Sequence, residues 1–343
     1  MSLPFKHILV IRLSAMGDVA MLVPVIRALS SAYPELKITI LTRPFFKPLF
    51  DDLQKVSVFE IDLKDRHKGL FGLWKLSRDL NHIGIEAIAD CHDVLRSNVL
   101  KIFMQQYPFY QIDKGRSEKK ALTSGQIFKP LKSTHQRYAD VFQSMKLPVT
   151  LEQPEFPEGP DIPDKVKPLL GEYSKLIGIA PFAAYESKEY PLEKMEEVIT
   201  ELSEDATILL FGGREDKSRL KAVADNHSGV ITLAGIMSFV EELKIIRNLN
   251  LMISMDSGNA HLSAAYGIPT ITVWGVTHPY AGFSPFHQDP SNAILADRSQ
   301  YPEIPTSVYG NKYPGAYRDA IATIDPLSIV RKARQIIKHQ TSS

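Results

Sequence analysis

Cysteine is almost absent from this 343-residue sequence, which contains only Cys91. A single cysteine excludes internal disulfide bonds and suits a reducing compartment. No run of about 18 apolar residues occurs, so the sequence predicts no membrane-spanning helix. The first residues lead directly into an apolar run and do not match the pattern of a secretory signal. These absences together predict a cytoplasmic protein.

Several motifs of nucleotide and metal chemistry are also missing. The sequence has no G-x-x-x-x-G-K-[ST] loop, no H-E-x-x-H, no C-x-x-C and no G-x-G-x-x-G after an apolar run. P-loop NTPases, zinc proteases, zinc ribbons and dinucleotide-binding enzymes are therefore not supported. Asp90 and Asp93 flank a Cys-His pair, but no third ligand is evident. We interpret these two aspartates as polar residues at the edge of a binding cleft and expect no metal.

Charge is balanced overall but not along the chain. The net charge is +1, yet residues 1–150 contain 22 Lys and Arg against 14 Asp and Glu, while the remainder contains 18 against 25. The first part therefore has a charge of +8 and the second a charge of −7. A basic first part fits an anionic partner, such as a phosphorylated saccharide or an acidic membrane surface, and the alternative is a merely solvated surface. Nothing in this pattern points to a nucleic acid.

Short apolar runs alternate with helical patterns along most of the chain, which predicts an α/β fold with doubly wound parallel sheets. The predicted strands are residues 6–13, 37–42, 56–61, 87–90, 176–180, 206–211, 231–233, 251–254 and 270–274. The predicted helices are residues 19–33, 45–50, 70–80, 95–104, 134–145, 192–202, 216–226, 239–248, 258–266 and 326–339. No regular element is predicted over 105–133 or 278–317.

A proline-rich stretch separates two similar sets of strands and helices. We therefore predict an N-terminal domain over residues 1–150, a linker over 151–168 and a C-terminal domain over 169–343. Two α/β domains of this kind are expected to enclose a cleft lined by the loops that follow their strands. The last helix, about 326–339, is expected to pack back on the first domain.

Residues 249–276 form the most informative stretch. An apolar run stops at Asp256-Ser257-Gly258, a helical pattern follows, and Gly267 and Pro269 end it before the next apolar run. A helix that begins directly after a strand presents unpaired N–H groups and a partial positive charge. The stretch therefore predicts an anion site, with Asp256 or Ser257 as the helix cap.

Asp18 and Lys188 lie where strands are expected to end, and His261 lies inside the helix that begins after Asp256. Each of them has more than one interpretation. Asp18 is either a first-turn acid stabilised by the helix dipole or a general base that faces the cleft. Lys188 is either a solvated loop residue or a cation that reaches a phosphate. His261 is either a buried helix histidine that bonds a neighbouring loop, or a metal ligand or acid–base group.

Several segments together match the motifs of one protein family. These segments are residues 12–24 with Gly17-Asp18, the loop with Lys188 before Tyr190-Pro191, and residues 256–279, which contain Asp-Ser-Gly-Asn-Ala-His and Trp-Gly-Val-Thr-His-Pro. They resemble glycosyltransferase family 9, the heptosyltransferases of lipopolysaccharide core assembly. The resemblance runs over nearly the whole chain in the right order, and the Asp-[Ser/Thr]-Gly-x-x-His segment is its most specific part.

The resemblance implies a GT-B architecture of two Rossmann-like domains, with the acceptor bound by the first and a nucleotide sugar, typically ADP-heptose, by the second. It implies an inverting transfer without a metal or other cofactor. Under it, Asp18 is the base for the acceptor hydroxyl, and Lys188 helps to hold the departing diphosphate. The donor phosphate or sugar is contacted by Asp256, Ser257, Gly258 and His261, and the nucleotide by Met237 and Glu215.

Two other functions remain open from the sequence. One is a sugar-nucleotide epimerase with the same fold, and the other is a non-catalytic nucleotide-sugar-binding protein. Under the transferase interpretation the partners are a nucleotide sugar and a lipid-linked or phosphorylated saccharide. Peripheral contact with the anionic inner face of the cytoplasmic membrane is expected as well.

Overall fold

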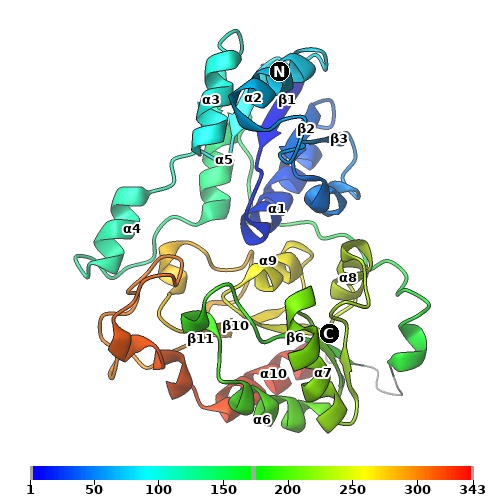
Figure 1. Cartoon of the computed structure of the whole chain (residues 1–343), viewed down its shortest axis with the longest axis vertical. Coiled ribbons are helices and arrows are strands. Elements are labelled where there is room, and N and C mark those ends of the chain that lie inside the picture. Colours follow the sequence, from blue (N-terminus) through cyan, green and yellow to red (C-terminus); the bar gives the residue numbers. More distant parts are fainter. Residues whose placement is uncertain (1–2, 171–174, 341–343) are drawn as a thin grey trace. The chain divides into compact units, whose positions relative to one another are not determined.

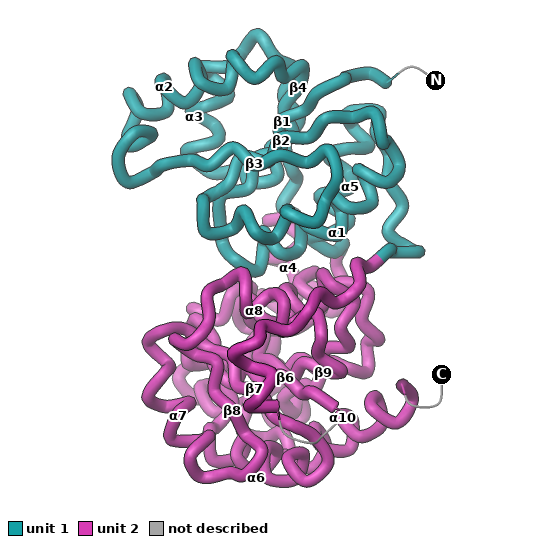
Figure 2. The backbone as a smooth tube through the Cα atoms, turned by 90° about the vertical axis from the view of Figure 1, so that its right-hand side faces the viewer, with its two compact units in different colours: residues 1–115, 132–155 teal, residues 116–131, 156–343 magenta. Residues whose placement is uncertain are grey.

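A computed structural model describes residues 3–170 and 175–340 of the chain. The chain divides into two compact units (Figure 2). Unit 1 comprises Met1–Gly115 and Lys132–Glu155, and unit 2 comprises Arg116–Leu131 and Phe156–Ser343. Each unit is built on its own parallel sheet, so the predicted doubly wound α/β class is confirmed.

Unit 1 is built on a five-stranded sheet in the order β3-β2-β1-β4-β5. Figure 1 labels its strands β1, β2 and β3. Its strands are β1 (His7–Ile11), β2 (Lys37–Thr42), β3 (Val56–Glu60), β4 (Ala87–Asp90) and β5 (Phe109–Gln111), all parallel. Its helices are α1 (Met16–Ala32), α2 (Gly69–Asn81), α3 (Leu95–Phe103) and α5 (Thr134–Ser144), with the 3₁₀ helix η1 (Pro44–Phe50).

The helices of unit 1 cover both faces of its sheet. The chain moves in one direction along the sheet from β1 to β2 and in the other from β3 to β4 and β5. Because such crossovers are right-handed, α1 lies on one face and α2 and α3 lie on the other. Leu73, Leu76 and Leu80 of α2 pack on the β1 side chains Leu9 and Ile11, which fixes the buried face of α2.

Unit 2 is built on a six-stranded parallel sheet in the order β11-β10-β9-β6-β7-β8. Its strands are β6 (Leu176–Ala180), β7 (Thr207–Leu210), β8 (Val230–Thr232), β9 (Leu251–Met255), β10 (Thr270–Trp274) and β11 (Ala293–Leu295). Its helices are α4 (Arg116–Thr123), α6 (Leu192–Ser203), α7 (Lys217–Asn226), α8 (Phe239–Ile246), α9 (Gly258–Ala265) and α10 (Pro326–Gln340). Within this unit α10 packs against α6, β9 and β10, and its expected packing on the first domain stays a prediction.

Residues 116–131 pack with unit 2 although they precede the predicted linker. The Lys119 ammonium lies 4.1 Å from the centre of the Phe283 ring, and the Arg298 guanidinium lies 3.5 Å from that of Phe128. The Leu131 amide donates to the carbonyl of Tyr280. These partners are more than 140 residues away in the sequence, so local periodicity gave no sign of this packing.

The predicted strands are all present, with ends shifted by a few residues. Among the described residues, the strands and α-helices that were not predicted are β5, β11 and α4. The two strands have three residues each, which is too short for an alternating pattern to stand out. Helix α4 is strongly polar, with Arg116, Glu118, Lys119 and Lys120 in its first five residues, and so has little apolar periodicity.

Candidate active site

Polar residues gather where the strands of each sheet end, and each unit has one such group. In unit 1 they follow β1 and β4, and in unit 2 they follow β6, β9 and β10. Ligands of open parallel sheets bind at this carboxyl edge.

Arg12 is the centre of the group in unit 1. Its side chain comes directly after β1 and is 7% exposed. The Arg12 Nη2 atom lies 2.6 Å from Asp18 Oδ2, and Nη1 donates to the Cys91 carbonyl over 2.7 Å. A buried guanidinium is stable only with such partners, so Arg12 ties the start of α1 to the loop after β4.

Asp18 lies in the first turn of α1 and remains 27% exposed at its side chain. Its Oδ2 accepts the backbone N–H of Ala15 over 3.1 Å, as a first-turn acid does. Its backbone carbonyl accepts the hydroxyl of Tyr138 over 3.1 Å. The carboxylate is therefore both anchored and accessible, so its stabilising role in the helix does not exclude a role as a base.

His92 is a buried structural group beside Arg12. The Leu13 amide donates to His92 Nδ1 over 2.8 Å, which places the ring proton on Nε2. Burial, followed by the nearby Arg12 cation, lowers the pKa of His92 to about 3. Asp90 fixes the same loop, because its Oδ1 accepts the backbone N–H groups of His92 and Asp93. His92 is therefore neutral near pH 7 and supports the loop.

The group in unit 2 is an ion pair between Lys188 and Asp256. Lys188 ends the 3₁₀ helix η3 (Glu186–Lys188) after β6, and Asp256 follows β9. Their Nζ and Oδ2 atoms are 2.9 Å apart, and the side chains are 12% and 9% exposed. The Thr277 hydroxyl after β10 donates to the same Oδ2 over 2.9 Å. Loops after three neighbouring strands thus converge on one carboxylate.

The Lys188 side chain is held along its length as well as at its tip. Gly310, at a φ of 84°, leaves room for it, since a Cβ atom there would lie 2.5 Å from Lys188 Cδ. The Ser187 hydroxyl donates to the Gly310 carbonyl over 2.6 Å. Residues 278–317, for which the sequence predicted no element, therefore contribute the wall that packs against the lysine.

Ser257 and Gly258 form the turn into α9 that the sequence predicted. Ser257 is the cap residue, but its hydroxyl lies 2.9 Å from Ser254 Oγ and makes no side-chain cap bond to the helix. Asp256 is likewise bonded to Lys188 and not to the helix. The amide groups at the start of α9 are thus not capped by either predicted side chain. His261 is buried one turn into α9.

Glu215 and Met237 lie in the loops after β7 and β8, at the same edge of the sheet. Glu215 is exposed and folds over Gly213, where an added Cβ would lie 2.5 Å from its Oε1. Met237 is half-buried and directly precedes Ser238, the cap residue of α8. Their predicted contacts with a nucleotide stay predictions.

Two neighbouring glutamates on α8 have opposite titration behaviour. Hydrogen bonds from Lys165 and Ser238 lower the pKa of Glu241 to about 2, whereas burial raises the pKa of Glu242 to about 7. Between about pH 4.5 and pH 7 the folded protein therefore holds a proton on Glu242 that the unfolded chain has lost. The contribution of Glu242 to the free energy of unfolding falls as the pH rises through this range.

We expect Glu242→Gln to stabilise the protein by about 2 kcal/mol at pH 8 and by little at pH 4.5. Urea unfolding of both proteins at the two pH values measures this difference. Glu241→Gln is the matched control, because its lowered pKa makes the carboxylate stabilising at pH 8 and its loss destabilising. An equal gain for Glu242→Gln at both pH values would contradict the assigned cause.

Sequence reasoning gave no role to Arg12, Tyr138 or Thr277. Arg12 could have been noticed as a charged residue at the end of an otherwise apolar strand. Tyr138 and Thr277 had no such signal, because each acts through a partner more than 20 residues away.

The described residues include no group of three or more His, Cys, Asp and Glu side chains arranged to hold a metal ion. Among the same residues, no helix combines the length and apolar character needed to cross a membrane.

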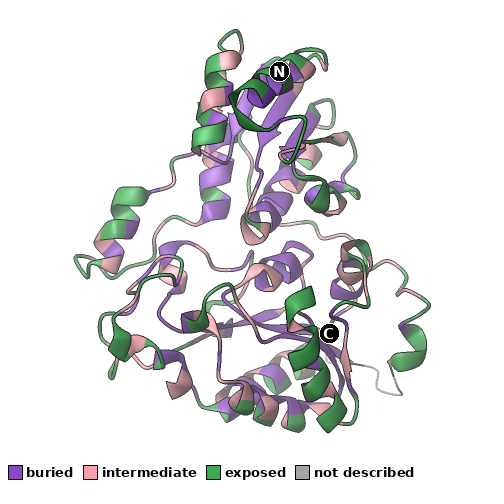
Figure 3. Ribbon diagram, in the orientation of Figure 1, coloured by how far each residue is buried: buried purple, intermediate pink, exposed green. Residues whose placement is uncertain are grey.

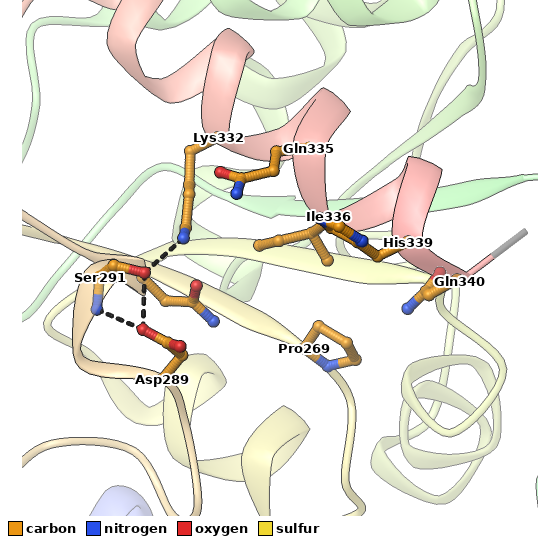
Figure 4. A pocket seen from close by; sticks show the side chains of 9 residues that line it. Pro269, Asp289, Ser291, Lys332, Gln335, Ile336, His339 and Gln340 are labelled. Carbon is orange, nitrogen blue, oxygen red and sulfur yellow. Dashed lines mark hydrogen bonds between the residues drawn. The ribbon is translucent and has the colours of Figure 1, made fainter. Parts of the chain in front are cut away.

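A pocket of about 630 Å³ in unit 2 lies away from these groups (Figure 4). It is lined by Pro269, which precedes β10, and by Lys332 and His339 of α10. Pro269 marks the amino edge of the sheet, whereas Asp256 and Thr277 lie at the carboxyl edge. Lys332 donates to the Ser291 hydroxyl over 2.5 Å, and that hydroxyl bonds Asp289. Lys332 and Asp289 are thus linked through Ser291, as the dashed lines in Figure 4 show.

The sequence also matches the model of a known protein family. The model of glycosyltransferase family 9 (heptosyltransferase) matches residues 73–311. The chain belongs to glycosyltransferase family 9. It is therefore a glycosyltransferase, and the epimerase and the non-catalytic binding protein are not supported.

Known heptosyltransferases and solved structures of family 9 match nearly the full chain. A lipopolysaccharide core heptosyltransferase, OpsX of Haemophilus influenzae, is 22% identical over 321 residues, with 89% of this chain and 87% of the relative covered. A family 9 glycosyltransferase from Veillonella parvula has a TM-score of 0.76 at 18% identity, with 99% of both chains covered. ADP-heptose lipopolysaccharide heptosyltransferase II of E. coli has a TM-score of 0.70 at 18% identity, with 98% and 99% covered. The GT-B fold expected for family 9 is therefore confirmed.

Proposed function

We propose that this family 9 member is an inverting, metal-independent heptosyltransferase. It transfers heptose from ADP-heptose to a lipopolysaccharide core or a related lipid-linked saccharide. The observation that supports the proposal most is the buried Lys188–Asp256 pair at the carboxyl edge of unit 2, next to the start of α9. It provides a fixed cation and free helix amides where a diphosphate would bind.

The transfer exchanges one bond for another. The oxygen of an acceptor hydroxyl attacks the anomeric carbon of the sugar, and the bond from this carbon to the diphosphate oxygen breaks. The hydroxyl proton passes to Asp18, whose carboxylate is accessible and held by Arg12. The electron pair of the broken bond leaves with ADP, whose added negative charge is stabilised by Lys188 and the first amides of α9. A fixed cation thus takes the place that a metal ion has in other enzymes.

Asp256 has a different task from Lys188. A carboxylate repels a diphosphate, but it accepts hydrogen bonds from sugar hydroxyls readily. Its Oδ2 is occupied by Lys188 and Thr277, which leaves Oδ1 for the sugar. We therefore assign Asp256 to the positioning of Lys188 and to the donor sugar. Ser257, Gly258 and His261 line the same turn, and Met237 and Glu215 are assigned to the nucleotide.

The donor can be tested by thermal shift with ADP-, UDP- and GDP-linked sugars. A ligand that binds only the folded protein raises its Tm, by a few degrees at concentrations well above Kd. We expect ADP and ADP-heptose to raise the Tm and the other nucleotides to have little effect. A larger shift with a UDP- or GDP-sugar would overturn the assigned donor.

A further inference from the structure

Helix α2 of unit 1 has apolar side chains on two sides. Leu73, Leu76 and Leu80 form its buried face. Leu70, Phe71 and Trp74 point elsewhere and are 68%, 66% and 40% exposed. The Phe71 and Trp74 rings stack, with centroids 5.4 Å apart and planes 18° apart. We call Leu70, Phe71 and Trp74 the aromatic face of α2.

The neighbouring helix extends this apolar surface. Helix α3 packs beside α2, and both show exposed residues along their outer sides (Figure 3). Leu95 and Ile102 of α3 are 83% and 62% exposed, and their spacing of seven residues places them on one stripe. Apolar side chains in such a group on a protein surface mark an interaction site.

Cations accompany the exposed rings. The Lys75 ammonium lies 4.8 Å from the centre of the Phe71 ring, and the Arg78 guanidinium lies 5.2 Å from that of Trp74. Arg96 and Lys101 of α3 are exposed as well. The one acid on the two helices is Asp79, which already pairs with Arg66. The surface is therefore cationic as well as apolar.

We propose that the aromatic face of α2, with the adjoining side of α3, docks this protein on an anionic lipid surface. Aromatic rings beside lysine and arginine suit the boundary between headgroups and acyl chains, because the rings enter the apolar layer while the cations bind phosphates. The charge complementarity with an acidic bilayer favours this occupant over a second copy of the chain, whose own cations would repel these. The inference rests on the proposed lipid-linked acceptor.

Trp74 provides a direct probe of this docking. The chain has two tryptophans, and Trp274 is only 1% exposed, so a change in emission on binding reports Trp74. We expect the full-length protein to bind vesicles of phosphatidylcholine and phosphatidylglycerol with a blue shift of its emission. Binding to phosphatidylcholine alone is expected to be weaker, and binding to the acidic vesicles falls as salt rises.

Two double variants separate the apolar and the charged parts of the surface. Phe71→Ser with Trp74→Ser, and Lys75→Gln with Arg78→Gln, are each expected to weaken vesicle binding about tenfold. Vesicle sedimentation measures this binding, because the first variant lacks the Trp74 probe. Phe45→Ser and Lys47→Gln are matched controls, because both residues are exposed on η1 of the same unit and lie outside the proposed surface. The controls should bind like the wild type.

Transfer to a delipidated, soluble acceptor separates this inference from the proposed function. Both double variants should keep wild-type transfer on that acceptor, while transfer to acceptor in acidic vesicles falls. Vesicle binding without a blue shift, or equal loss in the controls, would overturn the docking surface and leave the transferase intact. Loss of transfer on the soluble acceptor would assign α2 to saccharide binding instead. A wild-type dimer that the Phe71→Ser, Trp74→Ser variant dissociates would assign it to self-association.

Discussion

Asp18→Asn is expected to lower the rate of heptose transfer by about 10²–10⁴-fold, because asparagine cannot take the proton from the acceptor hydroxyl. The amide oxygen can still accept from the Arg12 guanidinium and the Ala15 amide, which Asp18 Oδ2 does in the wild type. The affinity for ADP should therefore stay close to that of the wild type, whereas the Tm should fall by a few degrees, because the buried Arg12 keeps its hydrogen bonds but loses its counter-ion. Steady-state rates with saturating donor, calorimetric ADP titration and thermal unfolding measure the three quantities.

Asp52→Asn is the matched control for this variant. Asp52 also pairs with an arginine in unit 1, since its Oδ2 lies 2.9 Å from Arg27 Nη2, and its side chain is 20% exposed. It has no proposed part in the reaction. A similar loss of transfer in both variants would mean that the rate depends on the integrity of unit 1 and not on a base at position 18.

Lys188→Met is expected to lower transfer by about 10²–10³-fold, because the charge that develops on the departing diphosphate loses its fixed cation. It should also destabilise the protein by about 3 kcal/mol, since Asp256 is then buried without its partner. ADP affinity should fall as well. The loss of activity and the loss of stability are thus mixed in this single variant.

The double variant Lys188→Met with Asp256→Asn separates the two effects. It removes both charges of the pair, and the amide can still accept from the Thr277 hydroxyl. We expect most of the stability to return while transfer stays low. Recovery of transfer together with stability would show that Lys188 acts only by neutralising Asp256, which would contradict its assignment to the diphosphate.

Features that depend on neighbouring residues could be predicted from the sequence. Asp18, Lys188 and Asp256 lie at strand ends as predicted, because an apolar run, a small-residue turn and a helical pattern follow one another there within a few residues. The start of α9 at Gly258 and its end before Gly267 were set by the same local signals. Buried parallel strands could also be predicted from the sequence, since they are apolar throughout.

Features made by distant residues could not be predicted in this way. Asp18 was predicted from its position after the first strand, but its partner Arg12 is held by the Cys91 carbonyl, 79 residues further along the chain. Asp256 or Ser257 was expected to cap α9. Ser257 takes the cap position without a side-chain cap bond, and Lys188 and Thr277 bond the Asp256 carboxylate. Lys188 binds the Asp256 carboxylate in preference to an amide of α9, because a charge-assisted hydrogen bond in a buried setting is stronger than a neutral one. Asp18, by contrast, bonds both Arg12 and the Ala15 amide.

One transfer reaction tests the proposed heptosyltransferase function most directly. The protein is incubated with ADP-heptose and a lipopolysaccharide core acceptor in the presence of a strong metal chelator, and the product is analysed by mass spectrometry and by NMR of the new anomeric centre. We expect one heptose to be added at an undiminished rate, with the anomeric configuration opposite to that of the donor. A product with retained configuration, or a reaction that the chelator stops, would contradict the account.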